Sequence, residues 1–227
     1  MEENNSLATS MQQTIEYSNL EFVSDIGGLM IDAALNDVVL KEVPILGTIV
    51  GVGKCIKNIY DILFAKKLIA FLVPIKDVPS EKRIKAIKKW EQDENFRGTV
   101  GDTLLGMVER CDDTVKANWL SILFYELVLK RNYSRLFMRS EKTLSSLSVM
   151  DVQAFLKMPK EQFYHITQKE CEPYIGSGLY QNPKLLSPVN ETINLDDAYS
   201  EPTEIGKWIY HVLNDIQIPV FDNNQLF

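Results

Sequence analysis

The chain has 227 residues, of which 45% are hydrophobic and 24% are charged, and its formal net charge is −7. This composition is ordinary for a soluble globular protein whose length permits a real core. Cys55, Cys111 and Cys171 lie far apart without metal-ligand spacing, which argues against a disulfide framework and favours the reducing cytoplasm. The polar, acidic start MEENNSLATS is unlike a secretion signal, so we expect no secretion.

The charges are unevenly distributed along the chain. Residues 1–38 carry −7, residues 39–142 carry +6 and residues 143–227 carry −6. This pattern predicts either surfaces of one fold that attract each other or a basic middle that meets an anionic partner.

The first 22 residues are polar, and we expect them to form an irregular tail. Residues 23–157 read as a helical domain. Within it, SDIGGLMIDAAL predicts a short helix capped by Ser24, although Gly27 and Gly28 weaken it.

An unusually apolar segment occupies residues 43–75. From Val43 to Val52 the only polar side chain is Thr48, and apolar residues dominate again from Ile59 to Ile75. Neither half reaches the length of a membrane span. Pro44 suits a helix start and Pro74 a helix end, so we predict two helices or one bent helix.

The stretch GTIVGVGKC, residues 47–55, resembles the end of a phosphate-binding loop. Such a loop needs G-x-x-x-x-G-K-[ST], because its amides wrap the phosphates and the final hydroxyl reaches the metal. Thr48 stands where the first glycine belongs, and Cys55 stands at the Ser/Thr position. We therefore expect no nucleotide site and no cofactor.

Two interpretations of the same segment remain open. Gly47 and Gly51 form a small-x-x-x-small pair that permits close helix packing, in a membrane or in a soluble core. Four lysines beside it would attract anionic headgroups if the segment meets a membrane, and otherwise form a solvated face: Lys54, Lys57, Lys66 and Lys67.

The middle of the chain is strongly helical. We predict Ser80 as the cap of a helix with Ile84, Ile87 and Trp90 on one face. Asp112 or Asp113 is predicted to cap the next helix, whose stretch ANWLSILFYELVL is apolar on most of its circumference. This should be the buried central helix.

Residues 158–227 change character and predict a small α+β winged-helix-like module. A helix stopped at Gly176 is followed by an extended run from Leu179, a polar connector, a short strand and a helix capped by Thr203. Residues 143–227 contain no Arg and carry −6, so this surface should repel nucleic acid.

Candidate catalytic groups are sparse. His165 and His211 are the only histidines, and neither has a nucleophile at a signature position nearby. They are also a poor zinc pair. We therefore predict no catalytic residues, no metal site and no small-molecule substrate.

The order of these segments resembles bacterial proteins of the abortive-infection alpha type and their uncharacterised relatives. The resemblance lies in VPILGTIVGVGKCIKNIYDILFAKKLIAFL, WLSILFYELVL and a C-terminal pattern of a leucine turn, a wing and a capped helix. That pattern is matched by Gly178, Leu179, Thr203, Glu204, Gly206 and Lys207, whereas Pro202 replaces the usual aliphatic residue.

The resemblance implies an association with phage defence and a membrane-damaging outcome, and it brings no catalytic residues. Together with the mainly helical fold, it leads us to expect a non-enzymatic defence protein in the cytoplasm. It would act peripherally at the inner membrane face or, alternatively, as a soluble subunit or sensor that binds a protein partner or itself.

Overall fold

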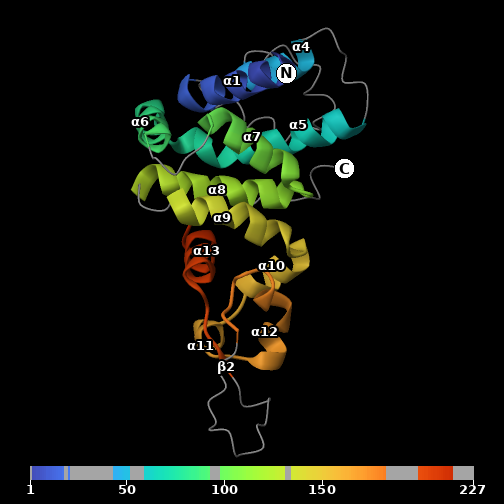
Figure 1. Ribbon diagram of the computed structural model, residues 1–227, viewed down its shortest axis with the longest axis vertical. Helices are drawn as coiled ribbons and strands as arrows, with labels where there is room; N and C mark the ends of the chain where they lie inside the picture. Colours follow the sequence, from blue (N-terminus) through green and yellow to red (C-terminus); the bar gives the residue numbers. More distant parts are fainter. Residues whose placement is uncertain are drawn as a thin grey trace, which may run out of the picture. The chain divides into compact units, whose positions relative to one another are not determined.

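The computed structural model describes residues 2–17, 20, 43–51, 59–92, 98–130, 134–182 and 199–216. The protein is mainly helical, with one small two-stranded antiparallel sheet among the described residues (Figure 1). The chain divides into two compact units, unit 1 up to Ser134 and unit 2 over residues 135–217. We predicted a boundary after residue 157, whereas unit 2 already includes most of α9 and all of α10.

Unit 1 is a helical bundle whose centre is α8. This helix packs against α5, η2 and α6, while α1 packs against α4, α6 and α7 (Figure 1). Its elements are α1 (Glu2–Tyr17), α4 (Pro44–Gly51), α5 (Ile59–Leu72), the 3-10 helix η2 (Val73–Asp77), α6 (Ser80–Glu91), α7 (Val100–Arg110) and α8 (Thr114–Lys130).

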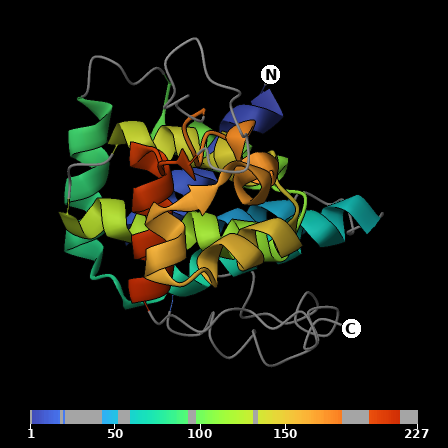
Figure 2. The same ribbon diagram turned by 90° about the horizontal axis from the view of Figure 1, so that it is seen from below.

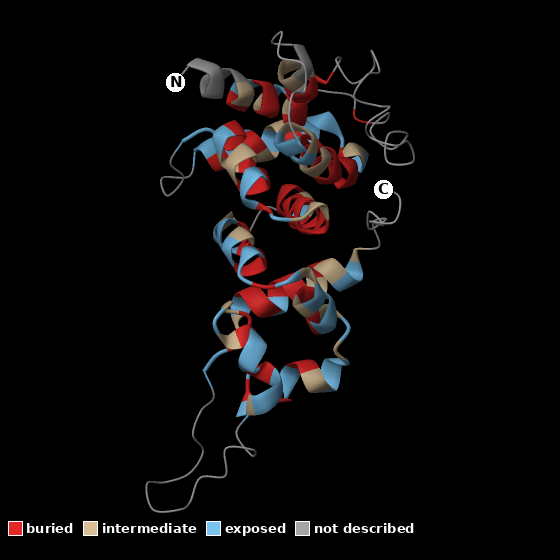
Figure 3. Cartoon of the chain, turned by 90° about the vertical axis from the view of Figure 1, so that its right-hand side faces the viewer, coloured by how far each residue is buried: buried red, intermediate tan, exposed pale blue. Residues whose placement is uncertain are grey.

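The prediction of a buried central helix is confirmed. Nearly every side chain from Val115 to Val128 in α8 is buried, and Figure 3 shows this helix as an almost continuous buried cylinder. Of the two residues predicted as its cap, Asp112 and Asp113, it is Asp113 whose carboxylate accepts a hydrogen bond from the Val115 amide, at 2.6 Å. By contrast, Ser80 is the first residue of α6, and the capping position belongs to Pro79, so the predicted Ser80 cap is wrong.

The expectation of an irregular tail over residues 1–22 is also wrong for most of that stretch. Residues 2–17 form α1, which buries Ala8, Met11 and Ile15 in the spacing of one helix face. Gly101 of α7 permits α1 to pack closely against α7, because a Cβ at this position would lie 2.1 Å from the Ala8 carbonyl oxygen. The helix predicted from Ser24 falls outside the described residues.

Unit 2 consists of short helices and the small sheet, whose strands contact α12 (Figure 1 and Figure 2). Strands β1 and β2 pair antiparallel, with Ile166 opposite Ser200. The elements are α9 (Ser134–Ser145), α10 (Val149–Leu156), α11 (Lys160–Tyr164), β1 (Ile166–Thr167), α12 (Gln168–Ile175), β2 (Tyr199–Ser200) and α13 (Glu204–Asp215).

The single helix that we predicted before Gly176 is in fact two helices separated by β1. Ile166 leaves the helical path to pair with β2, and Thr167 then starts α12 through a capping box with Glu170. The predicted stop is confirmed, since α12 ends at Ile175 and Gly176 follows as its C-cap.

The core of unit 2 is aromatic. Phe163 stacks on Tyr210 with ring centroids 4.0 Å apart, and Phe155 meets both Phe163 and Tyr180 edge to face. The hydroxyl groups of this cluster reach backbone carbonyls: Tyr180 donates to Phe163 at 3.0 Å and Tyr210 to Met158 at 2.6 Å.

The residues that carry the C-terminal pattern meet at one corner of unit 2. Thr203 caps α13 as predicted, accepting from the Gly206 amide at 3.1 Å, and its hydroxyl donates to the Gly178 carbonyl at 2.6 Å. The Thr203 amide donates to the Leu179 carbonyl at 2.9 Å. Gly178 has φ +84°, a conformation that favours glycine. The pattern therefore has a structural role.

Candidate interaction groove

The apolar segment enters the fold through α4. Val43, Ile45 and Leu46 are buried, and the Ile45 amide donates to the Thr14 hydroxyl of α1 at 3.0 Å. Ser10 and Thr48 are also joined, with their hydroxyl oxygens 2.7 Å apart. Through these contacts with α1, Ile45 and Leu46 of α4 belong to the core of unit 1.

The two halves of α5 have different surroundings. Its second half is core, since Ala65 and the run from Leu68 to Leu72 are buried. Its first half exposes Ile59 (65%), Tyr60 (77%) and Leu63 (47%). An exposed apolar group of this kind is typical of an interaction site when it adjoins a concave surface.

Such a concave surface lies alongside the first half of α5. It is a groove of about 530 Å³ between α5 and the corner where α7 is followed by α8. We call it the α5 groove, and its lining residues are Tyr60, Asp61, Leu63, Phe64, Lys66, Lys67, Glu109, Cys111, Asp112, Asp113 and Thr114.

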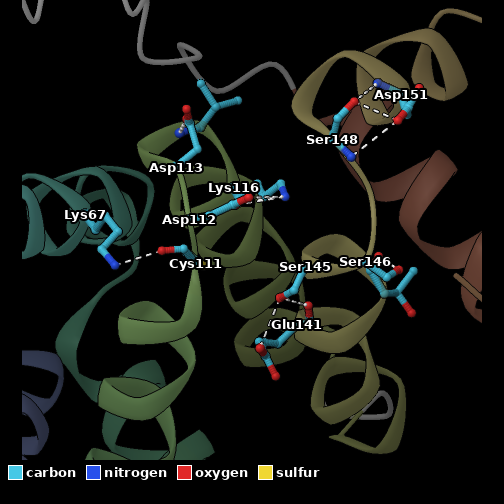
Figure 4. Close-up of polar contacts among 12 residues, drawn as sticks. Lys67, Cys111, Asp112, Asp113, Lys116, Glu141, Ser145, Ser146, Ser148 and Asp151 are labelled. Atoms are coloured by element: carbon cyan, nitrogen blue, oxygen red, sulfur yellow. Dashed lines mark hydrogen bonds and ion pairs between the residues drawn. The ribbon is translucent and has the colours of Figure 1, made fainter.

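Lys67 closes one side of the α5 groove. Its ammonium group donates to the carbonyl oxygens of Glu109 and Cys111, both at 2.7 Å, and Figure 4 shows the side chain extended toward Cys111. These carbonyl groups lie at the C-terminal end of α7, where the helix dipole favours a positive charge. The ammonium of Lys67 therefore holds α5 to α7.

The opposite wall is acidic. Asp112 forms an ion pair with Lys116 at 2.8 Å, in which the lysine side chain is 1% exposed and the carboxylate 67% exposed (Figure 4). Asp113 caps α8, and the Glu109 side chain is exposed. Counting all lining residues, four carboxylates face two lysines, so the groove carries a net negative charge.

Four of the six residues predicted to contact a membrane or partner lie among the described residues, on α4 and α5. Lys66 and Lys67 line the α5 groove, whereas Gly47 lies half-buried within α4 and Gly51 ends that helix. Lys54 and Lys57 lie outside the described residues, as does the part of the phosphate-loop motif from Val52 onward. The contact role of these six residues stays a prediction.

Neither histidine lines the α5 groove. His165 is exposed, and His211 shares a hydrogen bond with the Tyr164 hydroxyl at 2.9 Å on the surface of unit 2. Within the described ranges, no three His, Cys, Asp or Glu side chains are placed to hold a metal ion. None of the helices in that same part of the chain combines the length and apolarity that a bilayer crossing requires.

Sequence reasoning missed the apolar half of the groove. A signal was present: the sequence of α5 is apolar on more than one face, whereas a helix at the surface of a bundle needs only one apolar face. The acidic wall had no local signal, because it is more than 40 positions away in the sequence.

No family model, no curated protein and no solved structure matches this chain.

Proposed function

We propose that this protein is a non-enzymatic interaction protein that docks a protein partner in the α5 groove. We further propose that it serves bacterial anti-phage defence of the abortive-infection type, a context that rests on the resemblance of its sequence segments.

The observation that supports docking is the division of the apolar segment. Half of its residues whose burial is described are buried, in elements that pack against α1 and α8, and burial removes them from contact with a bilayer unless the bundle opens. What remains exposed is the small group of Ile59, Tyr60 and Leu63, two of which line a groove with polar walls. Large apolar anchors surrounded by polar groups are typical of protein interfaces.

For unit 2 we infer a winged-helix-like arrangement used for protein contact. Two features support it: β1 pairs with β2, and the chain on either side of the 183–198 connector is paired by hydrogen bonds of Gln181 with Glu201 and of Thr203 with Leu179. The net charge of −6 over residues 143–227 makes protein a more favourable partner than a nucleic acid.

A plating assay tests the proposed function in cells. Bacteria that carry the protein should reduce plaque formation by at least part of a phage panel, and the double variant Tyr60→Ser/Leu63→Ser should lose this protection. The matched control is Met150→Ser, which removes a 78% exposed apolar side chain from α10 in the other unit. Absence of protection by the wild type, or equal protection by the double variant, would contradict the proposal.

Peripheral membrane contact is the second candidate, because Ile59, Tyr60 and Leu63 lie on the same helix as Lys66. Co-sedimentation with anionic vesicles and dye release from them distinguish partner docking from membrane contact. Partner docking predicts that the protein stays in the supernatant. Co-sedimentation that disappears in Tyr60→Ser/Leu63→Ser would favour the membrane.

A further inference from the structure

We propose that the occupant of the α5 groove is a basic amphipathic segment of a partner protein, with large apolar side chains over Tyr60 and Leu63 and lysines or arginines along the acidic wall. This inference rests on the proposed function and specifies the chemistry of its partner.

The apolar part of the recognition comes from the first half of α5. Tyr60 and Leu63 are three residues apart, so they lie on one face of the helix, and Phe64 lines the groove beside them. The groove volume of about 530 Å³ is within the range of built binding sites and accommodates a few large side chains. An apolar stripe laid against these residues would remove the exposed tyrosine and leucine from water.

The polar part comes from the α7–α8 corner. Three carboxylates, those of Glu109, Asp112 and Asp113, lie there within five positions. Lys67, which lines the groove, already donates to two carbonyl oxygens, and Lys116, which pairs with Asp112 at 2.8 Å, is itself buried. The negative charge of this wall is therefore compensated only in part inside the protein.

This charge selects among the classes of partner. Anionic lipid headgroups and nucleic-acid phosphates would meet four carboxylates, and like charges brought together at an interface are unfavourable. The same carboxylates would repel an acidic peptide. A basic segment gains attraction, and its apolar side chains gain burial on the same face.

Two synthetic peptides test the inference with the full-length protein. One is a 14-residue amphipathic helix of leucine and lysine, and the other has glutamate in place of every lysine. Binding is measured by fluorescence anisotropy at low and high salt. We expect the lysine peptide to bind at least about tenfold more tightly than the glutamate peptide, and to weaken as salt screens the charges.

Variants locate the binding. Tyr60→Ser/Leu63→Ser should weaken the lysine peptide by about tenfold or more, and Glu109→Lys by roughly three- to tenfold. The control is Glu172→Lys, which reverses an exposed charge on α12 in unit 2 and should leave binding unchanged. Thermal unfolding of each variant verifies that the bundle is intact.

The outcomes separate this inference from the proposed function. A glutamate peptide that binds the groove as well as the lysine peptide overturns the basic partner but leaves docking in place. Self-association that is lost in Tyr60→Ser/Leu63→Ser, measured by light scattering, also overturns it, since a second copy then occupies the groove. If neither peptide responds to the groove variants and the plating phenotype is also unchanged, both proposals fail.

Discussion

At the scale of single residues, glycine positions in this protein are set by backbone contacts. Gly206 is the clearest case, because a Cβ there would lie 2.2 Å from the Leu179 carbonyl oxygen. The Leu179 carbonyl cannot move freely, since it accepts from the Thr203 amide. Gly176, by contrast, has no atom within 4 Å of its hypothetical Cβ and a helical φ of −65°.

These two glycines provide a matched pair of substitutions. Gly206→Ala should destabilise the protein by at least about 1–3 kcal/mol, because backbone must shift to make room. Gly176→Ala should be neutral or slightly stabilising, since alanine fits the helical conformation and lowers the entropy of the unfolded chain. Urea unfolding measures both, and equal losses of stability for the two variants would contradict the close approach.

The buried tyrosines of unit 2 give the protein a sensitivity to alkaline pH. Burial raises the pKa of Tyr180, and also that of Tyr174 and Tyr210, above the ordinary value, because the charged phenolate is poorly solvated there. A tyrosine that stays protonated in the folded state contributes no pH dependence well below its unfolded pKa of about 10. Above that pH the unfolded chain releases protons first, so stability should fall as pH rises.

Urea unfolding midpoints between pH 8 and pH 11 measure this effect. Tyr180→Phe should have a shallower decline above about pH 10 than the wild type. Tyr199→Phe, which alters an exposed side chain in β2, is the control. A wild-type midpoint that stays flat to pH 11 would refute the prediction.

At the scale of secondary-structure elements, polar side chains donate hydrogen bonds to backbone carbonyl groups near helix ends. Pro74 has no N–H to donate to the Ala70 carbonyl four residues earlier. Asn118 of α8 supplies the missing donor at 3.3 Å, and the buried hydroxyl of Ser121 donates to the Phe71 carbonyl. These contacts explain why α8 buries two small polar residues in an otherwise apolar helix.

Lys67 likewise donates hydrogen bonds to carbonyl oxygens at the C-terminal end of α7. Lys67→Met keeps most of the side-chain volume but removes the donor to two carbonyl oxygens, so we expect a loss of about 1.5–3 kcal/mol in the free energy of unfolding. Lys85→Met, on the exposed face of α6, should change it by less than about 0.5 kcal/mol. Chemical denaturation measures both, and a loss for Lys67→Met no larger than the control would contradict this role.

At the scale of the whole molecule, the chain forms two units with separate cores. Unit 1 is built around the aliphatic and aromatic side chains of α8, and unit 2 around the cluster of Phe155, Phe163, Tyr180 and Tyr210. Unit 2 contains Trp208 as the only tryptophan within residues 134–217, and its side chain is buried. It therefore has both a core and an internal reporter.

We expect residues 134–217 to fold when expressed alone. A chain of this size can form a stable core, and the cluster supplies several large aromatic side chains. The expected result is a helical circular dichroism spectrum and blue-shifted Trp208 fluorescence that changes in one cooperative transition on heating. Emission typical of a solvated tryptophan, without a transition, would show that unit 2 depends on the rest of the chain.

Several features could be predicted from the sequence because their causes are local. The helix start at Pro44, the caps at Asp113 and Thr203 and the stop at Gly176 each depend on neighbouring backbone groups. The burial of α8 follows from an apolar surface that no exposed helix could sustain. These features were fixed by chemistry within a few residues.

Other features were decided only in the tertiary structure. The close packing of α1 on α7 depends on Gly101, more than 80 positions away, and the break between α11 and α12 accompanies the pairing of β1 with β2. Likewise, Lys67 was expected to meet solvent or headgroups, but the folded bundle places it at the end of α7. The α5 groove combines residues near position 60 with residues near 110, and only the folding of α5 against the α7–α8 corner brings their charges and apolar side chains together.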